Sequence, residues 1–379
     1  MARPFSKGKK ATTGEAFIEE VVERKKAATE ECLDVFGNAL RPIEGFIRSG
    51  STTLDLVNGG GGYPLGRVAC IGGMPSSGKT LLAMEAAAHF HQQFNRDGGV
   101  IWYVDAENAF TNEYAKVIGF PQTARFIADS QGHCAIRTVE QLGSALEKRL
   151  KLLKEQPALF ILDSLDALST NEELSKDMDE NTMAMTKARV ISEFFRRYTA
   201  PLAEHHVCFF LIQQMRQKMS SYGTAYTKAG GNAPNFYASL ALRLTKTEAV
   251  TVTRNKEERE IGVNIDVKNE KNKVGWPHQK CSFQIRYDYG IYDILSCVEY
   301  LDQRDRLDGL PDKYTKNNEG KTIGIGSIAD RIRNLEDRAE YDEAVFILTE
   351  LTKQAWGDIS EAAKMTGQPK YIKEEQVDA

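Results

Sequence analysis

The sequence predicts an α/β fold in which helices flank a mostly parallel sheet. Strand-length apolar runs alternate with helix-length segments between residues 67 and 214, which is typical of parallel strands joined by helical crossovers. The segment 73–80 links such a run to residues 80–94, where apolar side chains recur at three- and four-residue spacing and indicate a helix. The expected parallel strands are 67–72, 100–105, 125–129, 158–163 and 207–214.

Three later runs predict an antiparallel extension of the same sheet. Residues 238–248, 261–269 and 279–287 alternate apolar with polar side chains and lie close together in the sequence, which favours antiparallel pairing. Before the first strand, residues 49–67 are interpreted as a glycine-rich turn that leads into the sheet.

The chain is expected to divide into three parts. Residues 1–48 hold a loose basic tail and an amphipathic helix at 15–37, whose apolar stripe packs either on its own domain or on a neighbouring subunit. Residues 49–290 form the α/β core. Beyond about residue 290 the composition becomes charged and mixed, so residues 291–379 are predicted to form a small α+β C-terminal domain.

Charge and hydropathy limit the classes of function. The 379 residues include 49 Lys and Arg against 53 Asp and Glu, a formal net charge of −4, so any nucleic-acid surface must be local. No apolar run reaches the length of a membrane span, and the first residues lack the apolar core of a signal peptide, so we expect a cytoplasmic protein. The six cysteines form no CxxC pair, and Cys70 and Cys208 are expected to be reduced core residues.

A phosphate-binding loop is the strongest motif in the sequence. Residues 73–80 match G-x-x-x-x-G-K-[ST], in which two glycines let backbone N–H groups turn inward toward phosphate oxygens. In this pattern Lys79 reaches the β- and γ-phosphates and Thr80 ligates Mg²⁺, so the sequence predicts a nucleotide site. The residues expected to bind the nucleotide are Gly73, Met74, Pro75, Ser76, Ser77, Gly78, Lys79, Thr80 and Leu81.

Two carboxylates follow apolar strands that should end beside this loop. Asp163 ends the run 158–163 and can hold the Mg²⁺ shell, although a lone strand-ending Asp is commonly a turn residue. Glu107 follows the run 100–105 and can deprotonate the water that attacks the γ-phosphate, or else serve as the N-terminal charge of the next helix. Asp105 competes for the role of base, but its place as the last strand residue favours a structural role.

Gln214 ends the last parallel strand directly before a long segment, 215–232, which is interpreted as an irregular loop. An amide beside a γ-phosphate can sense its loss and act as a switch. Arg216 and Lys218, interleaved with aromatic residues, are typical of single-stranded nucleic-acid binding, and a solvated loop is the plain alternative.

Taken together, these pieces resemble the RecA family of homologous-recombination ATPases between about residues 49 and 290. The likeness rests on "SGSTTLDLVNGGGGYPLGRV", "GGMPSSGKT", "DAENAFTNEYAKVIG", "LFILDSLDAL", "QQMRQK" and "AGGNAPNFYASLALRL". Met74-Pro75 inside the phosphate loop and Thr111, where the family carries an acidic residue, depart from the family pattern. The resemblance implies a RecA-type core.

The resemblance also implies roles for single residues. Glu107 is similar to the catalytic glutamate, Gln214 to the residue that links the γ-phosphate to the second DNA-binding loop, and Tyr114 to a residue that contacts adenine. Lys271 and Lys273 resemble a pair that reaches the ATP of the adjacent subunit. The region 177–187 would be the first DNA-binding loop, and the helix at 15–37 the element that links protomers. The DNA path would be lined by Arg189, Arg196, Arg216, Lys218, Gly230, Gly231 and Asn232.

The function implied by the resemblance is an ATP- and Mg²⁺-dependent DNA recombinase of DNA repair and the damage response. Such a protein polymerises on single-stranded DNA as a helical filament, pairs it with double-stranded DNA and exchanges strands, with DNA-stimulated ATP hydrolysis. Single-stranded-DNA-binding and loader proteins are further implied partners, and the nucleoid is the implied place, in the host cytoplasm if the protein is phage-encoded. A helicase-like motor on the same fold and a non-catalytic recombination mediator are the alternatives.

Overall fold

The computed structural model describes residues 43–175, 180–220, 223–228 and 233–363. These residues belong to the second of two compact units, Ile43–Ala379, and the helix expected at 15–37 lies outside them. Within the described part, no helix is long and apolar enough to cross a membrane.

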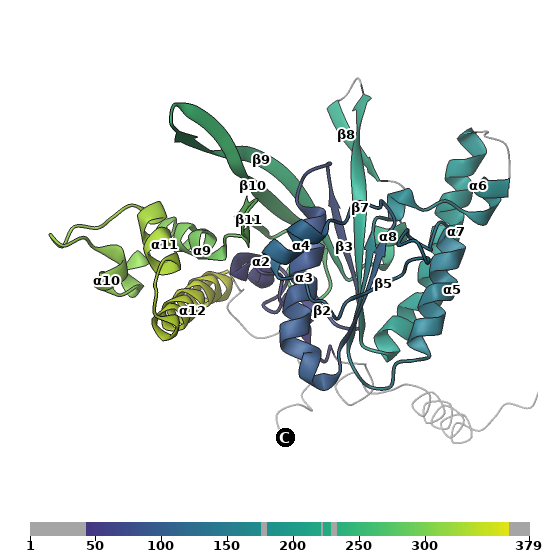
Figure 1. Ribbon diagram of the computed structural model, residues 1–379, viewed down its shortest axis with the longest axis horizontal. Helices are drawn as coiled ribbons and strands as arrows, with labels where there is room; N and C mark the ends of the chain where they lie inside the picture. Colours follow the sequence, from purple (N-terminus) through teal and green to yellow (C-terminus); the bar gives the residue numbers. More distant parts are fainter. Residues whose placement is uncertain (1–42, 176–179, 221–222, 229–232, 364–379) are drawn as a thin grey trace, which may run out of the picture. The chain divides into compact units, whose positions relative to one another are not determined.

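A ten-stranded sheet forms the core (Figure 1). Its order is β12-β11-β10-β9-β3-β7-β6-β4-β5, with β8 paired to β7, and every pair from β9 to β5 is parallel. The predicted α/β class with a mostly parallel central sheet is therefore confirmed. The strands of the parallel part are β3 (Val68–Gly73), β4 (Val100–Asp105), β5 (Arg125–Phe126), β6 (Ala158–Asp163), β7 (Val207–Ser220) and β9 (Leu240–Arg254).

The predicted antiparallel extension is also confirmed. Strand β10 (Glu257–Asn272) pairs with β9 on one side and β11 (Lys280–Arg286) on the other, and β12 (Gly290–Ile291) closes that edge. The β9–β10 hairpin is longer than the sequence pattern suggested, because its outer half is largely exposed and so lacks the apolar alternation of a half-buried strand.

Helices cover both faces of the sheet because strand side chains alternate between the two faces (Figure 1). Ile71 and Ile161 belong to the core beneath α3 (Lys79–Phe94) and α4 (Asn112–Ile118). Cys70 and Phe160 belong to the opposite core, with α5 (Val139–Leu150) and α7 (Glu180–Glu204). Burial on both faces explains the continuous apolar runs of the parallel strands. Cys70 and Cys208 are buried and belong to no disulfide bond in the described part of the chain, as expected.

Several boundaries differ from the expectations. The segment 215–232 is not an irregular loop throughout, because β7 continues to Ser220 and pairs with β8 (Gly223–Lys228), which satisfies its backbone groups in a hairpin. The region 177–187 is helical from Glu180 onward, as part of α7. The strand expected at 125–129 is two residues long.

The segment 49–67 is not all turn. It contains α2 (Thr52–Val57), a helix whose first turn Ser51 caps by accepting a hydrogen bond from the backbone N–H of Leu54. The short strands β1 (Phe46–Ile47) and β2 (Tyr63–Pro64) pair with each other on either side of it. The remaining short helices are η1 (Asn95–Asp97), η2 (Leu165–Ala167), α6 (Asn171–Ser175) and α8 (Ala233–Tyr237).

Residues after 292 pack around a hydrophobic core of their own, which includes Val298, Ile328 and Leu348. In their described part the secondary structure is helical apart from one isolated bridge, Lys316 with Thr322, so the α+β expectation is wrong there. The sequence after 335 has helical periodicity, and Asp337 caps the long last helix. The helices are α9 (Asp293–Asp302), η3 (Leu307–Gly309), α10 (Asp312–Thr315), α11 (Ile325–Arg333) and α12 (Arg338–Ala362).

Candidate nucleotide-binding site

The phosphate loop connects β3 to α3, as the strand–loop–helix pattern predicts. Gly78, at φ 83°, precedes the first helical turn, and a Cβ atom on Gly73 would lie 2.4 Å from the Ser77 hydroxyl oxygen. Glycine is therefore required at both positions. The buried Ser77 hydroxyl has no hydrogen-bond partner among the described residues. A loop that curls around an unsatisfied donor before a helix N-terminus fits a bound phosphate group.

Lys79 points into this loop. Its side-chain amine donates a hydrogen bond of 2.7 Å to the backbone oxygen of Met74. Burial lowers the pKa of Lys79, whereas the nearby carboxylates of Asp163 and Glu107 act in the opposite direction. A buried ammonium held among carboxylates at the helix start suits the recognition of a phosphate anion.

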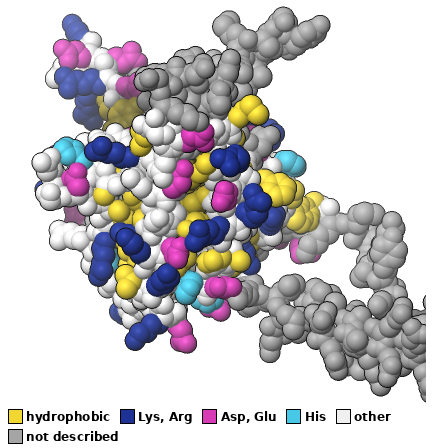
Figure 2. All heavy atoms as spheres, turned by 90° about the vertical axis from the view of Figure 1, so that its right-hand side faces the viewer, with side chains coloured by type: hydrophobic (Ala, Val, Ile, Leu, Met, Phe, Trp, Pro, Cys, Tyr) yellow, Lys and Arg dark blue, Asp and Glu magenta, His cyan; other side chains and the backbone are white. Residues whose placement is uncertain are grey.

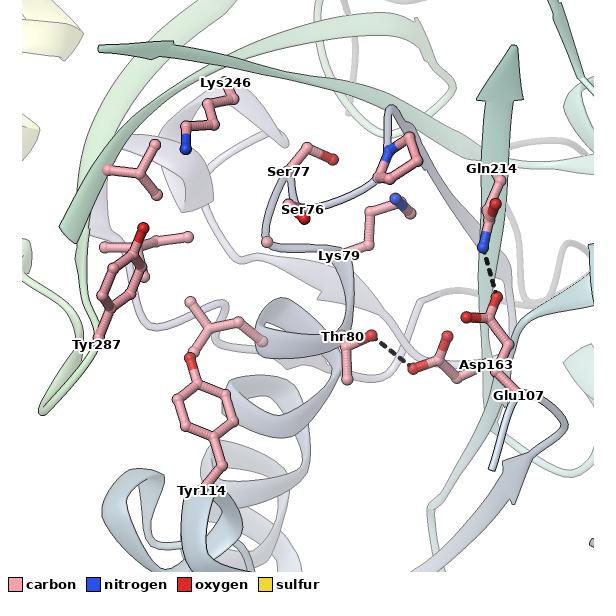
Figure 3. Close-up of a pocket in the computed structure, with 15 residues that line it drawn as sticks. Ser76, Ser77, Lys79, Thr80, Glu107, Tyr114, Asp163, Gln214, Lys246 and Tyr287 are labelled. Atoms are coloured by element: carbon pink, nitrogen blue, oxygen red, sulfur yellow. Dashed lines mark hydrogen bonds between the residues drawn. The ribbon is translucent and has the colours of Figure 1, made fainter. Parts of the chain in front are cut away.

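Thr80 and Asp163 form a pair suited to Mg²⁺. The Thr80 hydroxyl donates a 2.7 Å hydrogen bond to Asp163 (Figure 3). The Tyr103 hydroxyl donates to the same oxygen of Asp163 at 3.1 Å. Burial raises the pKa of Asp163 to about 6, and the Glu107 charge adds to this shift. Hydroxyl and carboxylate oxygens are hard ligands of the kind that Mg²⁺ prefers. A divalent cation bound here would also offset the repulsion between the Asp163 and Glu107 carboxylates.

Glu107 is held by two donors. The Gln214 side-chain amide donates a 2.8 Å hydrogen bond to Oε1 of Glu107 (Figure 3). The buried Ser164 hydroxyl donates to the same oxygen. Asp105 instead accepts hydrogen bonds from the backbone N–H groups of Ala109 and Phe110, which gives it the structural role expected of a strand-ending residue.

Two tyrosines and a lysine form the side of the site opposite Glu107 and Gln214. Tyr114 comes from α4, Tyr287 follows β11, and Lys246 comes from β9 (Figure 3). Burial raises the pKa of Tyr114 to about 12, so its hydroxyl stays protonated at neutral pH. Glu260 accepts hydrogen bonds from both Lys246, at 3.2 Å, and the Tyr287 hydroxyl. Sequence reasoning missed Lys246 and Tyr287, because their antiparallel strands carry no motif that marks this end of the sheet.

All these groups line one cavity of about 460 Å³. Gly73 and Met74 contribute to the loop without lining it. The residues predicted from the sequence that line it are Pro75, Ser76, Ser77, Gly78, Lys79, Thr80, Leu81, Glu107, Tyr114, Asp163 and Gln214. Apart from Tyr114 of α4, they lie at or directly after the carboxyl ends of β3, β4 and β6, or beside them on β7, because these parallel strands run in the same direction.

Lys271 and Lys273 do not line this cavity. Lys271 is near the end of β10, and its amine donates hydrogen bonds to the backbone oxygens of Asn235 at 2.8 Å and Phe236 at 2.5 Å in α8. Burial, together with the positive charge of Lys273, lowers the pKa of Lys271. The pair is therefore separated from the phosphate loop of its own chain.

The predicted DNA-contact residues are spread over two elements. Arg189 and Arg196 are exposed on α7, seven residues apart and so on one side of the helix, and Arg189 lies 3.8 Å from Glu172. Arg216 and Lys218 belong to the part of β7 that pairs with β8. Gly230, Gly231 and Asn232 lie outside the described residues.

The face on the α5 and α7 side carries charges of both signs. Figure 2 shows Lys and Arg side chains interspersed with Asp and Glu, and Glu147 of α5 lies 3.0 Å from both Lys151 and Arg197. This mixed pattern matches the small net charge of the chain and does not resemble a broad basic patch.

The chain is similar to a well-populated protein family. The RecA N-terminal domain model matches residues 21–292. Protein RecA of Arthrospira platensis is 31% identical over 312 residues, which cover 82% of this chain and 79% of the relative. Protein RecA of Nostoc punctiforme is 31% identical over 348 residues, or 90% and 89% of the two chains. Protein RecA of Borreliella afzelii is 35% identical over 247 residues, or 65% and 64%.

Proposed function

This chain belongs to the RecA family, and from that premise we propose that it is an ATP-dependent DNA recombinase. It would form a filament on single-stranded DNA, pair it with homologous double-stranded DNA and promote strand exchange. One observation carries the proposal: the phosphate loop, the Thr80–Asp163 pair, Glu107 and Gln214 line one cavity, and the strand of Gln214 continues into the β7–β8 hairpin.

The phosphate loop would hold the triphosphate. Backbone N–H groups at the start of α3 would donate hydrogen bonds to phosphate oxygens, and the buried Ser77 hydroxyl, which has no partner among the described residues, lines the same cavity. Lys79 would exchange its bond with the Met74 carbonyl for one to a phosphate oxygen. Thr80 and Asp163 would ligate Mg²⁺, which when bound neutralises the charge on the β- and γ-phosphates.

Glu107 would act as the general base. With Oε1 occupied by Ser164 and Gln214, the orientation of its carboxylate is fixed, and the other oxygen can accept a proton from the attacking water. Tyr114 and Tyr287 would contact the nucleotide on the side away from Glu107 (Figure 3). A carboxylate fixed before the substrate arrives lowers the cost of orienting it during the reaction.

Gln214 would couple hydrolysis to DNA. Its amide bonds Glu107, while its backbone belongs to the strand that runs on through Arg216 and Lys218 into the hairpin. A γ-phosphate that competes for the amide would shift Gln214 and the strand beyond it. In a filament, Lys271 and Lys273 would serve the site of the neighbouring protomer, which is consistent with neither of them lining the cavity of its own chain.

Electron microscopy and a pairing assay together test this function. With single-stranded DNA and a non-hydrolysable ATP analogue, we expect helical filaments, and with ATP and homologous duplex DNA we expect joint molecules and exchanged strands. Glu107→Gln should still form filaments but turn ATP over slowly, and Glu113→Gln, an exposed carboxylate on α4, is the matched control. Rings that unwind duplex DNA, or the absence of both filaments and turnover, would contradict the proposal.

A further inference from the structure

We propose that Asp166 is a positioning residue for ATP hydrolysis, which fixes the backbone of Gln214 so that its side-chain amide stays on Glu107. This inference rests on the proposed function. Asp166 lies in η2 (Leu165–Ala167), three residues after Asp163, and it does not line the nucleotide cavity. Apart from the effect of its charge on Lys79, it would therefore act on the reaction through the residues to which it is hydrogen-bonded.

The hydrogen bond between Asp166 and Gln214 is short and well placed. Oδ2 of Asp166 accepts the backbone N–H of Gln214 at 2.7 Å. A carboxylate acceptor makes this bond stronger than a bond between two neutral groups. On its other side, Gln214 is in register with Gly73, the first glycine of the phosphate loop. The backbone of Gln214 is thus held between the phosphate loop strand and the η2 turn.

Asp166 bonds the β7 backbone where β6 no longer pairs with it. The parallel pairing of β6 with β7 ends at Leu162 and Leu211, three residues before Gln214. Beyond that point the β6 chain turns into η2, and the Asp166 side chain supplies the acceptor for the β7 backbone. Without an acceptor there, Ile212–Gln214 of β7 would be tied to the sheet on the β3 side alone among the strand pairs described.

The same turn also holds the base. The Ser164 hydroxyl and the Gln214 amide donate to one oxygen of Glu107, so a shift of Gln214 relative to Ser164 would turn the carboxylate. Displacing a catalytic group by about 1 Å can cost on the order of 10²-fold in rate. Asp166 would therefore affect the chemical step rather than the affinity for ATP.

Asp166 joins both elements on which DNA contacts are proposed. Its backbone oxygen accepts a 3.1 Å hydrogen bond from the amine of Lys187, which lies on α7 two residues before Arg189. Its carboxylate holds Gln214, two residues before Arg216 on β7. A shift of α7 or of β7 on DNA would reach Glu107 through this one residue.

The test compares two variants that differ in whether an acceptor remains. Asp166→Ala removes the acceptor, and Asp166→Asn keeps a side-chain oxygen of similar reach; Asp97→Ala, an exposed residue in η1, is the matched control. On single-stranded DNA we expect Asp166→Ala to lower kcat roughly tenfold or more, with KM for ATP within about twofold. We expect Asp166→Asn to restore kcat to within about threefold, which a merely structural loss of charge would not do.

Hydrogen exchange separates this inference from the proposed function. The backbone amide of Gln214 should exchange faster in Asp166→Ala than in wild type or Asp166→Asn, whether or not the protein hydrolyses ATP. Unchanged exchange and unchanged kcat in Asp166→Ala, or an Asp166→Asn protein as slow as Asp166→Ala, would overturn the positioning role. If Asp166→Ala does not fold, Asp166→Leu, which keeps the branching without an acceptor, takes its place under the same outcomes.

Discussion

The parallel and antiparallel parts of this sheet place their functional side chains in different ways. In the parallel part, β3, β4, β6 and β7 end at one edge, so Lys79, Glu107 and Gln214 lie together although up to 135 residues separate them in the sequence. In the antiparallel part, successive strands end at opposite edges, so β9 and β11 send Lys246 and Tyr287 to the cavity while Lys271 contacts α8.

This difference indicates which groups one chain can supply alone. The phosphate loop, the proposed Mg²⁺ ligands, the proposed base and Gln214 meet in a single cavity. The two lysines of β10 and its following turn lie elsewhere, where a second copy of the chain would have to approach to use them. We therefore expect substitutions in the first group to have a large effect in a single chain, and substitutions in the second group to have an effect that depends on assembly.

The largest effect is expected at the base. Glu107→Gln keeps the shape of the side chain but cannot accept a proton from water, so ATP hydrolysis should fall by roughly 10²- to 10⁴-fold while ATP still binds. Lys79→Ala should instead weaken nucleotide binding, because the charge that meets the phosphates is lost. Phosphate release and a fluorescent-nucleotide titration distinguish the two. Wild-type turnover by Glu107→Gln would assign the base to another group.

The second effect should appear only in the assembled protein. Changing Lys271 and Lys273 together to Ala should leave ATP binding by dilute protein within about twofold of wild type, since neither lysine lines its own cavity. Hydrolysis on DNA and the ATP-dependent filament should both be lost, because a positive charge no longer meets the γ-phosphate of the neighbour. Full hydrolysis by the double variant on DNA would mean that each chain completes its own site.

A smaller effect is expected where β7 leaves the cavity. Neutralising Arg216 and Lys218 should weaken binding to single-stranded DNA and flatten its salt dependence. Two lost phosphate contacts should reduce the slope of log affinity against log salt by about 1.4, since each contact contributes about 0.7 on single strands. Fluorescence anisotropy over a range of salt concentrations measures the slope. An unchanged slope would indicate that Arg216 and Lys218 are solvated and do not contact DNA phosphates.

The last effect concerns the stability of the fold rather than ATP hydrolysis or DNA binding. Burial raises the pKa of Glu85 on α3 to about 7, and its Oε1 accepts the backbone N–H of Ile291 at 3.1 Å. The folded state thus keeps this proton to a higher pH than the unfolded chain. The resulting stabilisation is present below pH 4.5 and is lost as the pH rises toward 7 and above.

Glu85→Gln should remove the contribution of Glu85 to the pH dependence of the free energy of unfolding. This contribution is on the order of 3 kcal/mol between pH values well below 4.5 and well above 7. Thermal melts of wild type and variant at pH 5 and pH 8 measure it, with exposed Glu113→Gln as the control. Two nearby buried carboxyls with raised pKa, Asp55 and Asp293, should leave some pH dependence in the variant. Equal pH dependence in wild type and Glu85→Gln would show that Glu85 is ionised in the folded state at both pH values.

Much of this site could be predicted from the sequence because parallel strands are easy to recognise there. Asp163 and Glu107 follow continuous apolar runs, and their shared edge follows from the topology alone. Lys246 and Tyr287 could not be placed in this way, since the length and pairing of the β9–β11 strands decide where they point. The β7–β8 hairpin was missed because the polar residues after Gln214 lack the apolar alternation of a buried strand.

The hydrogen bonds of Ser164 and Asp166 could not be predicted from the sequence, for a further reason. Each is hydrogen-bonded to a residue far away in the sequence, Glu107 or Gln214, and such contacts depend on a short turn whose path no sequence pattern specifies. By contrast, the fold class needed no side-chain detail, because the alternation of strands and helices determined it.

We propose above all that one strand, β7, couples the nucleotide cavity to DNA. The most direct test is the rate of phosphate release by the wild-type protein with ATP and Mg²⁺, measured with and without single-stranded DNA. The account predicts that DNA increases this rate, because Gln214 links the hairpin to Glu107. Equal rates with and without DNA would contradict the coupling.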